Sequence, residues 1–81
     1  MARPRKEVDT STYAGKFAVH IKALREKRKL SVQELAEKSG LNISTLYYWE
    51  SATASPLIDQ LPTLADALGV KIGRLFPENT Q

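Results

Sequence analysis

The side chains with useful chemistry share one side of a helix that is expected to follow Asn42. Spacings of three and four residues bring four hydroxyl-bearing side chains together there: Ser44, Tyr47, Tyr48 and Ser51. Hydroxyl groups exchange hydrogen bonds with base edges and phosphates, and Ile43 in the first turn can meet the methyl group of thymine. These residue types favour recognition of a nucleic acid. The opposite side of the helix is expected to face the protein interior, and it holds Leu46, Trp49 and Glu50.

Catalytic and metal-binding residues are scarce. The chain has no cysteine and one histidine, His20, which we expect at or near the surface of the first helix. No glycine-rich phosphate loop and no pair of carboxylates at a useful spacing is present. We therefore expect a protein that is not an enzyme and that needs neither a metal ion nor a cofactor.

Two short helices joined by a tight turn are expected over residues 31–50. Ser31 and Glu34 have the Ser-x-x-Glu spacing of a capping box, which closes the start of a helix. Gly40 ends that helix because glycine adopts the left-handed conformation without steric cost, and Asn42 caps the next helix. Such a pair is a helix-turn-helix unit, whose second helix can enter the DNA major groove. The first helix should bury Val32, Leu35 and Ala36.

Apolar spacing predicts helices on both sides of this unit. The first spans residues 14–28, with a buried stripe formed by Ala14, Phe17, Ala18, Ile21, Leu24 and Arg28. Lys29 then occupies a left-handed linker position. A later helix within residues 57–68 contains Pro62, and because proline is tolerated only in a first turn, a start near Asp59 is favoured over a kinked helix. A short fifth helix with Val70, Ile72, Leu75 and Phe76 is expected to end at Pro77.

The charges are unevenly distributed along the 81 residues. Residues 1–29 contain nine of the twelve basic residues and three of the nine acidic ones, so this part carries +6 and the remainder −3. This asymmetry indicates a surface that faces a polyanion, and the alternative is a solvated basic surface. Residues 1–13 read as a flexible basic arm and 77–81 as a loose tail. No apolar run approaches a membrane span or a signal peptide, so a cytoplasmic protein is expected.

The order of these pieces resembles the Cro/phage-repressor (XRE) family of helix-turn-helix domains, which have a lambda-repressor-like all-α fold. The resemblance covers residues 17–76 without a gap and rests on IKALREKRKLSVQELAEKSG, LNISTLYYWE, LPTLADALGV and RLF. It implies five helices over residues 14–76, the third of them in the major groove of double-stranded DNA. It also implies an ion pair between Arg25 and Glu50, which the inward position of Glu50 independently favours, because a buried carboxylate needs a partner.

Three positions depart from the family pattern. Val32 stands where a phosphate-contacting glutamine is usual, with Gln33 next to it, and Ile43 stands where a polar residue is common. Ala52, Thr53 and Ala54 replace the usual glycine and basic residues of the loop that follows. We expect the arm to compensate for the weaker phosphate contacts.

The expected function is sequence-specific DNA binding by a transcriptional regulator, expected to be a repressor that acts as a homodimer. The predicted base-contacting residues are Ile43, Ser44, Tyr47 and Tyr48. The predicted phosphate-contacting residues are Gln33, Thr45, Thr53, Arg3, Arg5 and Lys6. Packing is the alternative role for Ile43 and the two tyrosines. The alternative function is a protein-interaction module, such as an antitoxin-like partner, on the same fold.

Overall fold

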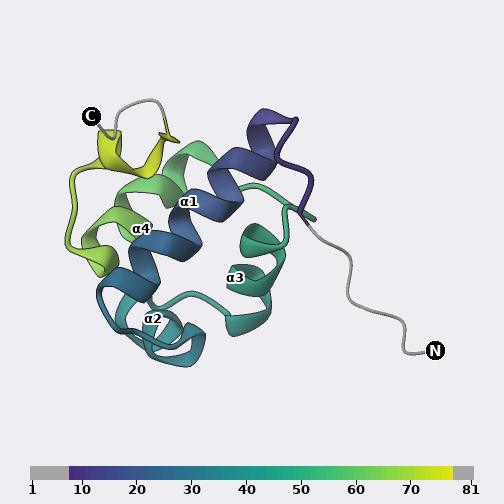
Figure 1. The fold of residues 1–81 in the computed structure, drawn as a ribbon. Helices are drawn as coiled ribbons and strands as arrows, with labels where there is room; N and C mark the ends of the chain where they lie inside the picture. Colours follow the sequence, from purple (N-terminus) through teal and green to yellow (C-terminus); the bar gives the residue numbers. More distant parts are fainter. Residues whose placement is uncertain (1–7, 78–81) are drawn as a thin grey trace.

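A computed structural model describes residues 8–77, and helices form all the regular structure in this range (Figure 1). Four α-helices and two short 3₁₀ helices follow one another in these residues, with no strand between them. They are α1 (Tyr13–Lys27), α2 (Val32–Ser39), α3 (Ile43–Glu50), η1 (Ile58–Gln60), α4 (Leu61–Leu68) and η2 (Ile72–Leu75).

One apolar core joins all four α-helices. α2 packs against both α3 and α4, while α1 lies across the bundle and packs on α3 and η2 (Figure 1). The most deeply buried large side chains come from α2, α3, α4 and η2, and they are Leu35, Leu46, Leu64, Leu68 and Leu75. Because α3 is held from two sides, by α1 and by α2, its orientation is set by the core.

The start of α1 differs from the prediction. Val8 is half-buried, and Asp9 to Thr12 form a hydrogen-bonded turn, so this part of the expected arm is folded. Thr12 caps α1, its Oγ1 accepting a hydrogen bond from the Gly15 amide at 3.0 Å. Gly15 is buried beneath the turn: a Cβ there would lie 1.8 Å from the Asp9 carbonyl oxygen. Ala14, predicted to be buried, is exposed because this first turn of α1 extends past the core.

The other end of α1 leads directly into the helix-turn-helix unit. Lys29 has the predicted left-handed conformation, with φ of 60°. Arg28, predicted to be in the buried stripe, is exposed and acts as the C-cap of α1. Its Nη2 donates to the Gly69 carbonyl at 3.0 Å, which ties the end of α1 to the end of α4.

The region around Pro62 confirms part of the prediction. Pro62 lies in the first turn of α4, as expected, and α4 ends at Gly69 with φ of 73°. Asp59, however, is not its N-cap: it lies inside η1, which leads into α4 without a side-chain cap. The Gln60 side chain instead accepts a hydrogen bond from the Leu57 amide at 2.8 Å.

The expected fifth α-helix is a single 3₁₀ turn. η2 has only four residues, which is too few to repay the cost of starting an α-helix. Phe76 precedes Pro77 and is extended, because the proline ring disfavours the helical conformation of the residue before it. Leu75 is nevertheless fully buried, so this turn still closes the core. Ile72 is 43% exposed and does not pack as predicted.

Candidate nucleic-acid interface

The first helix of the helix-turn-helix unit begins at a complete capping box. Ser31 Oγ accepts from the Glu34 amide at 3.0 Å, and Glu34 Oε1 accepts from the Ser31 amide at 2.8 Å. At the other end Gly40 is left-handed, with φ of 74°, and its amide bonds to the Ala36 carbonyl. These caps set the start and the end of α2 locally, and they leave Gln33 exposed in its first turn.

α3 has a buried side and an uncovered side, as the spacing predicts. Leu46 and Trp49 are almost completely buried. Ser44 is exposed, and the tyrosine side is open as well, with Tyr47 and Tyr48 at 55% and 53% exposure. The uncovered side of α3 can therefore contact a macromolecule without rearrangement of the core.

Two predicted contact residues of α3 are less available. Ile43 is half-buried and packs against the core, which supports the alternative packing role for this side chain. Thr45 is also half-buried. Asn42 Oδ1 accepts a hydrogen bond from the Ser44 amide at 3.1 Å, so that oxygen caps α3.

The expected ion pair between α1 and α3 is present. Arg25 Nε lies 2.7 Å from Glu50 Oε2, and Arg25 Nη2 lies 3.1 Å from Glu50 Oε1, so the contact is bidentate. Arg25 Nη1 also donates to the Leu30 carbonyl at 2.7 Å. The hydrogen bonds to Glu50 raise the pKa of Arg25 above its usual value, and they outweigh the opposite effect of desolvation. One side chain thus connects α1, α3 and the start of α2.

The loop after α3 is held by its own hydrogen bonds. The Thr53 amide donates to the Tyr48 carbonyl at 2.9 Å, and the Thr53 hydroxyl lies 2.8 Å from the Ser51 hydroxyl. Ala52 takes the left-handed conformation, with φ of 62°, at a position where glycine is usual in the family that the sequence resembles. Thr53 is exposed, but nothing in the loop carries a positive charge.

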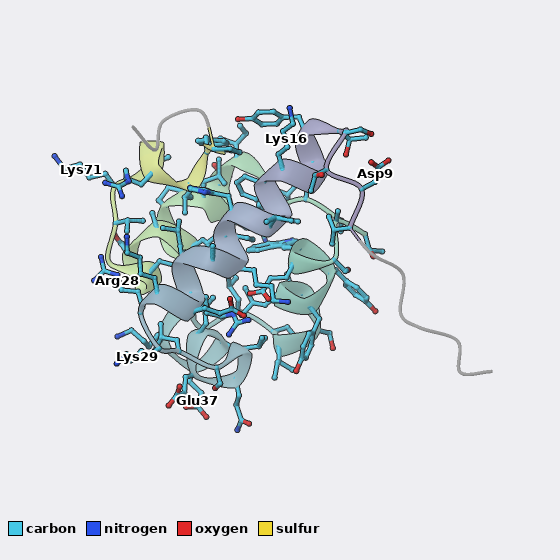
Figure 2. All side chains as sticks on the ribbon, viewed as in Figure 1. Asp9, Lys16, Arg28, Lys29, Glu37 and Lys71 are labelled. Atoms are coloured by element: carbon cyan, nitrogen blue, oxygen red, sulfur yellow. The ribbon has the colours of Figure 1, made fainter. Side chains whose placement is uncertain are left out.

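Part of the positive charge of the described residues lies away from α3, where the charge asymmetry suggested a cationic flank. Figure 2 shows Arg28, Lys29 and Lys71 along the side of the view opposite to α3. The predicted phosphate contacts Arg3, Arg5 and Lys6 lie outside the described residues. Arg28 and Lys29 lie away from α3 because the turn after α1 continues past the end of that helix, and Arg28 bonds there to the end of α4.

The prediction from sequence missed one cation on the flank of α1 from which Arg25 reaches α3. Lys22 is exposed and lies three residues before Arg25, on the flank of α1 that faces toward α3. The inferred Arg25–Glu50 pair could have identified this flank, because it shows which side of α1 approaches α3.

The one histidine of the chain has a contact within the fold. His20 is half-buried, and its Nε2 lies 2.6 Å from the Arg74 carbonyl oxygen, so it joins α1 to η2. Within residues 8–77, no three histidine, cysteine or acidic side chains come together in a way that could hold a metal ion. None of the helices in this range is long and apolar enough to cross a membrane.

Comparison with known proteins finds a helix-turn-helix family and a phage repressor. Residues 21–75 match the family HTH_3, described as helix-turn-helix. An immunity repressor protein of Bacillus phage phi105 is 38% identical over 60 residues, which are 74% of this chain. The aligned part is 42% of that repressor, so this chain matches less than half of it.

Among the solved structures with a similar fold, one is matched over almost its whole length. The restriction-modification controller protein C.AhdI from Aeromonas hydrophila is 31% identical, with a TM-score of 0.73 over 75% of this chain and 92% of its own. A hypothetical transcription factor, NHTF, from Neisseria has a TM-score of 0.77 over 94% of this chain and 87% of its own. At 22% identity, the second likeness shows the fold alone.

Proposed function

The chain belongs to the Cro/phage-repressor (XRE) family of helix-turn-helix DNA-binding domains, and from this premise we propose that it is a sequence-specific transcriptional regulator. It binds double-stranded DNA with α3 in the major groove. It acts as a repressor by occupying a control region, a role supported by the phage immunity repressor among its relatives. The observation that carries the proposal is the uncovered side of α3.

Base contacts come from the outward side of α3. Ser44, Tyr47 and Tyr48 are exposed, while the inward side is held by the core and by the Arg25–Glu50 pair. A helix placed in the groove reads sequence only if its orientation is constant, because a base contact requires hydrogen-bond geometry. Ile43 contributes at the edge of this surface through its exposed part.

Phosphate contacts surround this surface and position it. Gln33 lies in the first turn of α2, where backbone amide groups and the positive end of the helix dipole attract an anion. Thr53 and the open part of Thr45 flank α3, and Lys22 adds a charge on the same side. The basic residues Arg3, Arg5 and Lys6 supply further charge from the arm.

The active species is a homodimer on a symmetric operator. Two copies of α3 then meet half-sites about 34 Å apart, one helical turn of DNA. The proposed dimer surface centres on Leu57 and Ile58, which are 70% and 79% exposed. Ile58 lines an apolar groove of about 280 Å³, and Leu57 precedes it in the sequence, so a second copy could place the same pair in its partner's groove. The groove is lined by Tyr13, Ala14, Phe17, Ser55, Pro56, Ile58, Leu61 and Phe76.

Replacing Ile58 by aspartate tests the dimer. Val19→Asp is the matched control, because Val19 is also an exposed apolar residue, at 45%, but does not line the groove. We expect Ile58→Asp to sediment as a monomer under conditions in which the control and the parent protein sediment as dimers. If Ile58→Asp and Val19→Asp sediment in the same way, the proposed dimer surface is contradicted.

Selection of bound duplexes from a random pool tests the function. We expect a symmetric motif, and we expect Tyr48→Ala to lose most of the preference for it while Glu37→Gln, on the exposed side of α2, keeps it. A pool from which no motif emerges contradicts sequence-specific binding.

The second candidate function, a protein-interaction module, has one observation in its favour. Residues 30–70 contain a single basic residue, Lys38, so α3 and its surrounding loops offer a duplex little charge. Salt dependence separates the two functions. Binding to DNA weakens steeply with salt because counterions are released, whereas a contact between tyrosines and a protein surface does not.

A further inference from the structure

The outward side of α3 has small residues along its centre and large ones along its edges. Successive residues are rotated by about 100°, so Ser44 and Ser51, seven residues apart, lie almost in line. Tyr47 and Tyr48 lie on opposite sides of that line. Both tyrosines are more than half exposed, so they lie outside the core. The result is a narrow strip with a serine at each end and an aromatic ring on each flank, which we call the serine strip.

Hydrogen bonding makes the two ends of the strip different. The Ser51 hydroxyl is engaged by the protein, because it donates to the Tyr48 carbonyl at 3.2 Å or pairs with the Thr53 hydroxyl at 2.8 Å. The Ser44 hydroxyl makes no hydrogen bond within residues 8–77, so it remains available to a base edge. The strip therefore offers one free polar group next to apolar ring surface.

The strip lacks the groups that recognise guanine and adenine most strongly. Arginine or lysine contacts guanine and asparagine or glutamine contacts adenine, in each case through two hydrogen bonds. α3 contains no arginine, lysine, asparagine or glutamine. Asn42, just before α3, uses its side-chain oxygen for the cap, so it cannot form the paired contact with adenine.

Resting on the proposed function, we propose that the serine strip recognises thymine. Thymine is the base that presents an acceptor oxygen, O4, beside an apolar methyl group in the major groove. The Ser44 hydroxyl donates to O4, and the neighbouring methyl group lies against the rings of Tyr47 and Tyr48. Cytosine is disfavoured because it has no methyl group at this position, although the Ser44 hydroxyl can accept a hydrogen bond from its N4 donor.

The thymine methyl group should make a measurable contribution to the binding affinity. Removing one buried methyl-sized group costs about fourfold in affinity, which corresponds to ~0.8 kcal/mol. Deoxyuridine differs from thymidine only by this methyl group and keeps O4. Replacing a thymine beneath α3 by deoxyuridine should thus weaken binding by about fourfold, with the hydrogen bond from Ser44 intact.

The test uses the full chain and the operator obtained by selection from a random pool. Each thymine of a half-site is replaced in turn by deoxyuridine. The dissociation constant of the deoxyuridine duplex is divided by that of the thymine duplex, and this quotient is the thymine-to-deoxyuridine ratio. We expect about fourfold weakening at one or two positions per half-site. Where a thymine beneath α3 can be replaced by cytosine without loss of binding, the protein should bind a duplex with 5-methylcytosine at that position more tightly than one with cytosine.

Variants then assign the effect to the strip. Ser44→Val fills the space between the rings and should reduce the thymine-to-deoxyuridine ratio to about one. Ser44→Ala removes the hydrogen bond but not the space, so it should weaken binding and keep the ratio. Tyr47→Phe and Tyr48→Phe keep both rings, and they should keep the ratio too. A ratio that changes in Ser44→Ala, Tyr47→Phe or Tyr48→Phe overturns the assignment, so these conservative variants keep it testable even if Ser44→Val fails to fold.

The outcomes separate this inference from the proposed function. A motif with thymine beneath α3 and a ratio that Ser44→Val abolishes supports both. A motif that lacks thymine at these positions, or a ratio of one in the parent protein, overturns the inference and leaves sequence-specific binding intact. A pool without any motif overturns both.

Discussion

Replacing Glu50 by glutamine tests how α3 is anchored. Arg25 and Glu50 share a bidentate contact at 2.7 and 3.1 Å, with side chains 10% and 8% exposed. Removing one charge from a buried pair leaves the other uncompensated and costs roughly 3–5 kcal/mol. Glutamine keeps one acceptor oxygen, so we expect a loss near the lower end, about 3 kcal/mol. A chain of this length is stable by roughly 4–12 kcal/mol, so the loss is a large share of the total.

Urea unfolding followed by tryptophan fluorescence measures this loss. Trp49 is the sole tryptophan and is 3% exposed, directly beside Glu50 in the sequence. Glu26→Gln is the matched control, because Glu26 lies 4.0 Å from the same guanidinium but its side chain is 59% exposed. An exposed pair of this kind contributes less than about 1 kcal/mol. The reasoning is refuted if Glu50→Gln lowers the free energy of unfolding no more than Glu26→Gln.

A double variant separates two contributions to the free energy of unfolding: that of the ion pair, and that of the single charge left unpaired when one partner is removed. Arg25→Met alone leaves Glu50 without its partner and also removes the bond to the Leu30 carbonyl. Arg25→Met combined with Glu50→Leu removes both charges. We expect the double variant to be more stable than Arg25→Met, because apolar replacements of a buried pair are often close to neutral. A double variant that is less stable than Arg25→Met would show that the unpaired Glu50 carboxylate costs little. A double variant much less stable than the parent would show that the pair contributes more than its desolvation costs.

Three further predictions concern the backbone and the start of α1. Gly15→Ala should lower the urea midpoint, because its Cβ would meet the Asp9 carbonyl oxygen at 1.8 Å and displace the turn. Ala52→Gly should raise the midpoint by relieving part of the roughly 1–2 kcal/mol cost of the left-handed conformation. Hydrogen bonds from Ser11 lower the pKa of Asp9 below 3.8, which an NMR titration of its carboxyl group can check. Because the pKa is lower in the folded state, the stabilisation by Asp9 is present at neutral pH and is lost as the pH falls through the folded-state pKa.

The helix-turn-helix unit was predictable because its ends are local. The capping box at Ser31, the left-handed Gly40 and the Asn42 cap each depend on residues at most four positions apart, and all three are observed. The burial of Leu46 and Trp49 was predictable for a similar reason: helical periodicity alone separates the two sides of α3.

The elements on either side of the helix-turn-helix unit were less predictable. η2 has the apolar residues of an α-helix, but its length and the adjacent Pro77 allow only one 3₁₀ turn. Asp59 has the residue type of an N-cap, yet η1 precedes α4 directly. Ala14 matches the period of the buried stripe, but the core does not extend to that turn of α1.

By itself, the amino-acid sequence determined the approximate places of the four α-helices of the described residues, the caps of α2 and α3, and the side of α3 that would be uncovered, since these follow from residue types within a few positions of one another. Only the tertiary structure decided where α1 carries its charges, because the direction of a helix end depends on what the helix packs against. It likewise decided that Ile43 is half-covered while Ser44 remains open between two exposed rings. The exposure of a side chain depends on neighbours that are close in space but distant in the chain.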